Sequence, residues 1–307
     1  MNAIFIDCRP EVRELLTGEI MDLVPSLEIN LGQPVAEEIP ALLDGRAAAL
    51  VYQTALPERV LAASPELRLV VFLSTGASSY IDFDVARRLG VRVRNVASYG
   101  DRTVAEHALA LMLAAARDLA AMDRGVRAGE WRPRDGVELA GKTLGLVGLG
   151  GVGRALAGIA APFGMRVIGW NRSGVPAGLA CEAVGLDELL ARADVVSLHL
   201  ALNDETRGLI DRRRLGLMRS NAILVNTARG ALVDEVALAE ALEARKLRHA
   251  ALDVFGEEPL AAEHPLARTA RTTLSAHVAY RTPEATTRLL RLGLGILRDE
   301  LAALEAG

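Results

Sequence analysis

Residues 144–154 read Leu-Gly-Leu-Val-Gly-Leu-Gly-Gly-Val-Gly-Arg. The apolar start predicts a buried strand, which leads into the pattern Gly148-x-Gly150-x-x-Gly153, and a helical pattern rich in alanine continues to residue 163. In such a loop the first glycine permits a tight turn, the second leaves bare backbone beside a phosphate, and the third lets the helix pack closely on the sheet. The spacing therefore predicts a dinucleotide-binding loop.

The position of this loop between a strand and a helix is stronger evidence for dinucleotide binding than the glycine pattern alone. A lone G-x-G-x-x-G is weak evidence in a chain that contains 28 glycines, but a match placed between a strand and a helix is much less expected by chance. Free N–H groups at the start of that helix, at Gly151 and Val152, are expected to bind the pyrophosphate.

The next strand ends in Trp170-Asn171-Arg172-Ser173. An acidic residue usually stands here and binds the hydroxyls of the adenosine ribose. Asn171 can still bind the ribose, whereas the guanidinium of Arg172 and the hydroxyl of Ser173 suit a 2′-phosphate. We therefore expect NADPH (NADP) to be preferred over NADH (NAD); the alternative is a solvated turn whose arginine touches nothing.

Around this loop, short apolar segments alternate with helical patterns along the whole chain, which is typical of parallel α/β sheets. We expect one helix over residues 11–21, four strands before residue 98 and six after residue 142, which are enough for a complete dinucleotide-binding domain. The last helix, residues 284–304, follows that sheet and is expected to return to the first domain. The expected strands are residues 3–6, 48–51, 69–73, 92–95, 143–147, 166–170, 195–198, 222–226, 249–253 and 272–274.

The fold expected from this pattern is α/β, with a Rossmann-type dinucleotide-binding domain inserted in a flavodoxin-like substrate domain. The substrate domain comprises residues 1–98 and 283–307, and the dinucleotide-binding domain comprises residues 99–282. The apolar helix expected at residues 104–117 must be buried, and residues 125–141, which contain Trp131, are interpreted as an irregular arm.

Three polar stretches follow three successive strands of the second domain. They are Asn-Thr-Ala-Arg-Gly ending at Gly230, Asp-Val-Phe-Gly-Glu-Glu-Pro ending at Pro259, and Ser-Ala-His ending at His277. Ligands of open α/β sheets bind at the carboxyl ends of parallel strands. With the helix start Val104-Ala-Glu-His, these stretches resemble the signatures of the D-isomer-specific 2-hydroxyacid dehydrogenases, and the resemblance covers nearly the whole chain.

The resemblance implies roles for three residues. Arg229 matches the arginine that binds the substrate carboxylate, Glu258 the acid that orients the histidine, and His277 the group that donates or accepts the proton. Each alone would more often be structural or solvated, and Glu257 competes locally with Glu258. It is their order behind one cofactor loop that favours a catalytic set acting in a cleft between the domains.

The resemblance also implies contacts around these three residues. Gly76 and Ala77, in the loop after a strand of the first domain, match backbone groups that bind the substrate carboxylate; an ordinary strand-to-helix turn remains the alternative. The expected cofactor contacts are Thr103 at the nicotinamide, the backbone of Thr227 and Ala228, and the carboxylate of Asp253. His199 matches a position near the cofactor, and no metal site is expected.

Composition excludes several other classes. A net charge of −4 gives no general attraction to nucleic acid or to an anionic membrane. The start of the chain lacks the pattern of a signal peptide, and no apolar run is long enough to span a membrane, so we expect a cytoplasmic protein. The apolar helix at 104–117 and the arm with Trp131 suggest a homodimer, as in the family.

The expected reaction is hydride transfer between NAD(P)H and a small 2-oxo acid or 2-hydroxy acid, with reduction of glyoxylate or hydroxypyruvate as the first choice. Dehydrogenases of bulkier 2-hydroxy acids are the alternative, and Tyr280, next to the catalytic stretch, could narrow the pocket. The alternative outside the enzymes is a nucleotide-binding sensor or scaffold without turnover, although such a protein would not need Arg229, Glu258 and His277 together. Relatives that act on formate carry Gln at the position of Glu258, which argues against that reaction.

Overall fold

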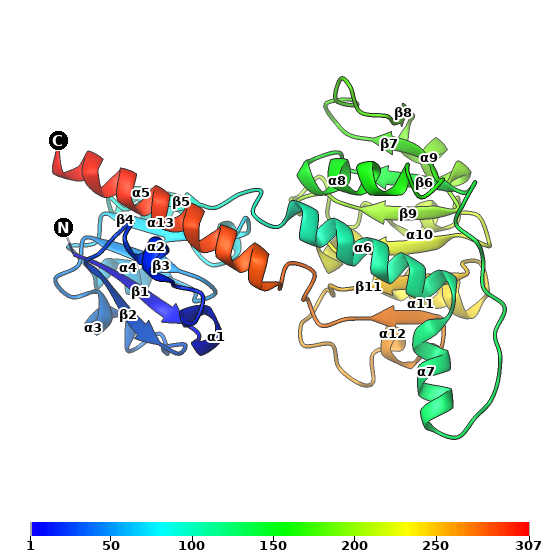
Figure 1. Cartoon of the computed structure of the whole chain (residues 1–307), viewed down its shortest axis with the longest axis horizontal. Coiled ribbons are helices and arrows are strands. Elements are labelled where there is room, and N and C mark those ends of the chain that lie inside the picture. The colour runs from blue at the N-terminus through cyan, green and yellow to red at the C-terminus, as the bar shows by residue number, and fades with distance from the viewer. Residues whose placement is uncertain (1, 307) are drawn as a thin grey trace. The chain divides into compact units, whose positions relative to one another are not determined.

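The computed structural model of the protein describes residues 2–306, which separate into two compact units (Figure 1). The first unit contains the residues up to Gly100 and those from Arg281 onward, and the second is Asp101–Tyr280. Each unit is built on one sheet, of five strands in the first and seven in the second, and the described strand pairs are parallel. The α/β fold class expected from the sequence is confirmed.

The first unit has the strand order β2-β1-β3-β4-β5, which is the order of flavodoxin-like sheets. Its strands are β1 (Ala3–Cys8), β2 (Leu27–Leu31), β3 (Ala48–Val51), β4 (Leu69–Phe72) and β5 (Arg92–Asn95). Its helices are α1 (Pro10–Arg13), α2 (Gly18–Met21), α3 (Ile39–Leu43), α4 (Glu58–Ala62), the 3₁₀ helix η1 (Ala77–Ser79), α5 (Phe83–Arg88) and α13 (Pro283–Glu305).

Helix α13 joins the end of the chain to the first sheet (Figure 1). A Cβ at Gly293 would lie 2.2 Å from the Leu73 side chain, so glycine lets the helix approach the end of β4 closely. Glu300 of α13 forms ion pairs with Arg92 and Arg94 of β5, at 3.0 and 2.5 Å. Among the described residues, no helix, not even the 23 residues of α13, combines the length and apolar character that crossing a membrane requires.

Two expectations for the first unit were wrong in detail. The single helix over residues 11–21 is instead α1 and α2, because the backbone of Thr17 is extended (φ −69°, ψ 168°) ahead of Gly18. Strand β2 was not expected, since it lies at the edge of the sheet and only Leu27 of its five residues is fully buried. An edge strand that is half solvated shows no continuous apolar run.

The second unit has the strand order β12-β11-β10-β9-β6-β7-β8, the doubly wound order of dinucleotide-binding sheets with one added strand. Its strands are β6 (Thr143–Val147), β7 (Arg166–Trp170), β8 (Glu182–Ala183), β9 (Val195–Leu198), β10 (Ile223–Asn226), β11 (His249–Leu252) and β12 (Thr272–Leu274). Its helices are α6 (Asp101–Ala116), α7 (Leu119–Arg127), α8 (Gly151–Ala160), α9 (Leu186–Arg192), α10 (Arg212–Leu215), the 3₁₀ helix η2 (Gly230–Leu232), α11 (Glu235–Glu243) and α12 (Pro265–Arg268).

Alternate residues of these strands enter two separate cores, because successive side chains of a strand point to opposite faces. Leu144 and Leu146 pack with α6 and α8 on one face, whereas Val147 and Val196 pack with α9, α10 and α11 on the other. Seven of the sixteen residues of α6 are buried within this unit, against α8 and the strands β10 and β11, so the helix is buried on one side and not all round as expected. Six strands were expected where seven form, because β8 has two exposed residues and carries no pattern.

Candidate active site

The phosphate loop lies where the order of the second sheet reverses, between β6 and its neighbour β9. Gly148 has φ +101°, and a Cβ there would lie 2.5 Å from the carbonyl oxygen of His199, which follows β9. A Cβ at Gly153 would lie 2.2 Å from the Gly148 carbonyl oxygen. Close packing within the protein therefore requires glycine at the first and third positions.

Gly150 differs from these two glycines. It caps the N-terminus of α8 with ordinary backbone angles, and a Cβ there would meet no protein atom within 4 Å. No contact among residues 2–306 explains glycine at this position, whereas the close approach of a pyrophosphate to the backbone would. The N–H groups of Gly151 and Val152 open α8, and the Asp101 carboxylate lies so close that a Cβ at Gly151 would be 1.8 Å from it. The sequence offered no signal for this position of Asp101.

Two buried polar atoms add to the fit of a dinucleotide. Within residues 2–306, the Thr227 hydroxyl and Nε2 of His199 have no hydrogen-bond partner although both atoms are buried. They follow the neighbouring strands β10 and β9 at the carboxyl edge of the sheet. Burial lowers the pKa of His199 to about 4, so its ring is neutral near pH 7. Buried polar groups are normally satisfied, so an unpartnered pair at this edge is consistent with a bound polar ligand.

The segment after β7 forms the expected ribose end of the site. Oδ1 of Asn171 accepts a hydrogen bond from the Leu149 N–H at 3.4 Å, and its Nδ2 donates to the Ser173 hydroxyl at 2.7 Å. Arg172 is exposed and forms an ion pair of 2.6 Å with Glu205. The side chain of Arg172 is thus solvated, but it does not lack a partner as in the alternative that the sequence left open; the acidic partner was not expected.

The histidine and the acid of the proposed catalytic set are in direct contact. Nδ1 of His277 lies 2.7 Å from Oε2 of Glu258, and the other oxygen of Glu258 accepts from the Phe255 N–H at 3.0 Å. The carboxylate is thus held at both ends, and the histidine side chain is 39% exposed. A ring whose Nδ1–H is bound to a carboxylate presents Nε2 as its remaining proton donor or acceptor.

Asp253 is the centre that holds the loop of His277. Its carboxylate is fully buried and accepts hydrogen bonds from the Ser275 hydroxyl (2.6 Å) and from the N–H groups of Val278 (3.0 Å) and Ala279 (2.9 Å). Its carbonyl oxygen accepts from the His277 N–H at 2.8 Å. Burial acts to raise the pKa of Asp253, but the bonds from His107, Ser275 and the two N–H groups outweigh it and keep the pKa below its usual value.

His107 extends this network from α6, since its Nε2 lies 3.0 Å from the Ser275 hydroxyl and 3.5 Å from the Asp253 carboxylate. His249 is a buried structural residue: burial lowers its pKa to about 4, and it contacts Thr273 and Asp118. The carboxylate of Asp253 was expected to contact the cofactor. In the structure four groups of the protein already surround it: the Ser275 hydroxyl, the N–H groups of Val278 and Ala279, and the His107 ring.

Arg229 lies on the next loop of the same edge. Its guanidinium donates to the Ala228 carbonyl at 2.7 Å, and Asn226 braces the turn through both ends of its side-chain amide. A Cβ at Gly230 would lie 1.9 Å from the backbone of Phe255. The loop of Arg229 thus packs directly on the loop that contains Glu258, and this is the contact that glycine after the arginine permits.

The other residues expected to bind the cofactor or the substrate, Thr103, Gly76 and Ala77, have no unusual local structure. Thr103 is buried in the first turn of α6. In the first unit, Gly76 precedes η1 and its N–H donates weakly to the Ser74 hydroxyl at 3.4 Å, while Ala77 is buried. These features fit the expected carboxylate loop and equally fit a strand-to-helix turn.

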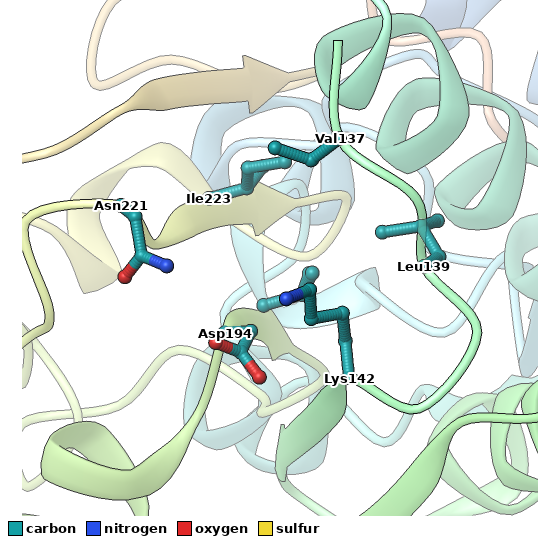
Figure 2. A pocket seen from close by; sticks show the side chains of 7 residues that line it. Val137, Leu139, Lys142, Asp194, Asn221 and Ile223 are labelled. Carbon is teal, nitrogen blue, oxygen red and sulfur yellow. The ribbon is translucent and has the colours of Figure 1, made fainter.

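A small cavity at the opposite edge of the second sheet is not part of this site. Figure 2 shows its lining, which includes Lys142, Asp194 and Asn221, at the amino ends of β6, β9 and β10. Its volume of about 30 Å³ admits a water molecule but no organic acid. The described residues contain no group of histidines, cysteines and acids suited to a metal ion.

The chain is similar to proteins of one known family. The model of the family described as D-isomer specific 2-hydroxyacid dehydrogenase, NAD binding domain, matches residues 109–279. A glyoxylate reductase of Aeropyrum pernix is 43% identical over 252 residues, which are 77% of this chain and 75% of that protein. A D-3-phosphoglycerate dehydrogenase of Mycobacterium leprae is 42% identical over 240 residues, which are 76% of this chain but only 45% of that protein.

Among solved structures, an acyclic imino acid reductase in complex with NADPH and D-Arg superposes with a TM-score of 0.87 at 28% identity, over 99% of this chain and 98% of that one. The family match covers more than half of the chain and includes the phosphate loop, Arg229, Glu258 and His277. The chain therefore belongs to the D-isomer specific 2-hydroxyacid dehydrogenases, a family of NAD-dependent oxidoreductases.

Proposed function

We propose that this protein catalyses the NAD(P)H-dependent reduction of a small 2-oxo acid to the D-2-hydroxy acid, and the reverse oxidation. The observation that carries the proposal is the contact of 2.7 Å between His277 Nδ1 and Glu258, at the strand edge that also bears the phosphate loop. A redox-silent nucleotide sensor would need the loop but not this pair.

In the proposed reaction, bound NAD(P)H supplies the hydride that reduces the carbonyl carbon. His277 donates the proton from Nε2 to the carbonyl oxygen as negative charge develops on it, and in oxidation the neutral ring accepts that proton. Glu258 keeps Nδ1 protonated and stabilises the charged ring. The hydrogen bond from the Phe255 N–H, at 3.0 Å, orients the carboxylate for this role.

Arg229 is proposed to bind the substrate carboxylate and to polarise the carbonyl, since a guanidinium pairs with a carboxylate in a fixed, two-point geometry. Gly76 and Ala77 are proposed to bind a substrate carboxylate through their backbone N–H groups. Replacing Arg229 with Lys keeps the charge but removes the fork, so KM for the 2-oxo acid should rise more than tenfold while the affinity for NADPH stays unchanged.

The cofactor is proposed to be NADPH in preference to NADH. The observations in support are the Arg172 guanidinium and the Ser173 hydroxyl after β7, where an acid would select the free ribose hydroxyls. The similar imino acid reductase is in complex with NADPH. The test compares kcat/KM for the two cofactors, and a clear preference for NADH would reject the assignment.

Glyoxylate and hydroxypyruvate are the proposed substrates. The Tyr280 ring stands edge-on to the His277 ring at 6.4 Å between centroids, which limits the room beside the proton donor. The Aeropyrum pernix relative is a glyoxylate reductase. We expect NADPH consumption to be fastest with these two acids in a panel that includes pyruvate, 2-oxoisocaproate and 3-phosphohydroxypyruvate, the last because of the phosphoglycerate dehydrogenases among the relatives. No turnover with any acid would favour a sensor or scaffold.

We further propose that the protein forms a homodimer through α7 and the arm that follows it. None of the residues of α7 is buried, and Leu119, Val126 and Trp131 are 50, 54 and 86% exposed. A second copy of the chain would remove this apolar surface from water. Light scattering tests the proposal directly, and a monomer at micromolar concentration would reject it.

A further inference from the structure

The ion pair of Arg172 and Glu205 concerns the choice of cofactor and is not explained by the reaction. Arg172 follows β7, where the adenosine ribose binds in this type of sheet. Glu205 lies 33 residues later, in the loop after β9, and its carboxylate is 2.6 Å from the guanidinium. The Glu205 carboxylate is thus already bound to the guanidinium that would bind a 2′-phosphate.

The loop of Glu205 is built to hold it in place. The side chain of Asn203 accepts from the N–H groups of Glu205 and Thr206, both at 3.0 Å. The Thr206 hydroxyl accepts from the Asn203 N–H at 2.8 Å and donates to the Ala201 carbonyl at 2.8 Å. On the other side of the ion pair, the side chain of Asn171, which precedes Arg172, is bonded to the phosphate loop and to Ser173, and this anchors the turn from which Arg172 extends.

We propose that Glu205 is a residue that determines cofactor specificity, by competing with the 2′-phosphate for Arg172. This inference rests on the proposed function, because it assumes that the ribose end of a bound dinucleotide reaches Arg172. A 2′-phosphate must displace the carboxylate or share the guanidinium with it, and either route opposes NADPH. NADH carries no charge at that position and is affected little.

The size of the effect follows from exposure. Both side chains are largely exposed, at 80 and 69%, so solvent screens the interaction. A carboxylate about 5 Å from a phosphate in water opposes binding only moderately, so removing its charge should raise affinity for the phosphate roughly three- to tenfold. Glu205 therefore moderates a preference for NADPH and does not abolish it.

The experiment measures binding of two small probes, 2′,5′-ADP and 5′-AMP, by calorimetry on the full-length chain, so that no catalytic step enters. We expect Glu205→Gln to bind 2′,5′-ADP three- to tenfold more tightly and 5′-AMP within twofold of the unchanged protein. Asp204→Asn is the matched control, because it removes the same charge from the neighbouring exposed residue, and neither affinity should change by more than twofold.

The inference is overturned if Glu205→Gln does not raise the affinity for 2′,5′-ADP relative to the affinity for 5′-AMP. A fall in this relative affinity would mean that Glu205 holds Arg172 in the orientation that binds the phosphate. It is also overturned if Asp204→Asn gives the same gain, which would reduce the effect to net charge. Failure of the proposed function is observed separately, in the unchanged protein. It appears as absence of turnover with every 2-oxo acid, or as a preference for NADH. In either case Glu205→Gln can still change the affinity for 2′,5′-ADP relative to that for 5′-AMP.

Discussion

His277 has a backbone φ of 51°, a left-handed conformation that costs a non-glycine residue energy unless the surroundings hold it there. The surroundings are the bond from its N–H to the Asp253 carbonyl and the bonds from the next two N–H groups to the Asp253 carboxylate. The position of the ring is therefore decided by the loop as well as by Glu258, and both contributions can be tested by substitution.

Replacing His277 with Ala should lower kcat by about 10²–10⁴-fold, because the proton transfer loses its donor. The affinity for NADPH should stay within about twofold, since the ring is not part of the phosphate loop. Stopped-flow turnover and calorimetric titration measure the two quantities, with His264→Ala as a control in a histidine that caps α12. Near-normal kcat would remove His277 from the mechanism.

Replacing Asp253 with Asn should lower the free energy of unfolding by about 1–3 kcal/mol at pH 7, because an amide N–H would face the N–H of Val278 or Ala279. We also expect kcat to fall at least tenfold, since the loop that carries His277 loses its anchor. Denaturant unfolding and steady-state kinetics measure the two effects. A stable and fully active Asp253→Asn protein would contradict the role of this carboxylate.

The same residue predicts a pH dependence. The folded pKa of Asp253 is below its ordinary value, so ionisation stabilises the fold above about pH 4 and this contribution is lost as pH falls through the folded pKa. Denaturant unfolding at pH 7 and at stepwise lower pH below about 4 should therefore show a smaller loss of stability in Asp253→Asn than in the unchanged protein. Equal losses would show that other carboxylates account for the acid sensitivity.

At the scale of an element, the loop from β6 to α8 contains glycines of two kinds. Gly148 is required by the protein itself, because φ is +101° and a Cβ would contact the His199 carbonyl. Gly150 has ordinary backbone angles and open space around it. Folding therefore requires glycine at position 148, whereas at position 150 the proposed binding of the cofactor requires it.

We expect Gly148→Ala to lower the free energy of unfolding by at least about 1–3 kcal/mol, the cost of a strained backbone, and to weaken NADPH binding as a consequence. Gly150→Ala should leave Tm nearly unchanged but weaken NADPH binding at least tenfold. Gly158→Ala, also in open space on α8, controls for helix propensity. Thermal unfolding and calorimetric titration decide the case, and unchanged affinity in Gly150→Ala would contradict the proposed site of the pyrophosphate.

At the scale of the whole molecule, each unit has its own sheet and its own hydrophobic core. Units of this size can unfold separately. The proposed contacts with the dinucleotide lie in Asp101–Tyr280, so NADPH should stabilise that unit directly by about 2.7 kcal/mol at a concentration 100 times Kd. In scanning calorimetry we expect two transitions, of which NADPH raises one more than the other; one cooperative transition, raised as a whole, would show that the units unfold together.

The sequence by itself determined the α/β class, most strand positions and the order of the motifs. Parallel strands buried on both faces form continuous apolar runs, and their carboxyl ends share one edge, so residues just after successive strands can be assigned to a common site. This reasoning identified the glycine loop and the three stretches that contain Arg229, Glu258 and His277, whose individual roles came from the resemblance to the D-isomer-specific 2-hydroxyacid dehydrogenases. It failed for β2 and β8, because edge strands that are short or half exposed lack the apolar pattern.

Only the tertiary structure decided which side chains meet. Asp253 faces both Ser275 and the backbone after His277, and His107 reaches this network from α6 across 168 positions of sequence. Glu205 lies against Arg172 because the loops after β9 and β7 approach each other. The physical reason is that hydrogen bonds and ion pairs between loops depend on rotamers and loop paths, for which no periodicity of the sequence provides a signal.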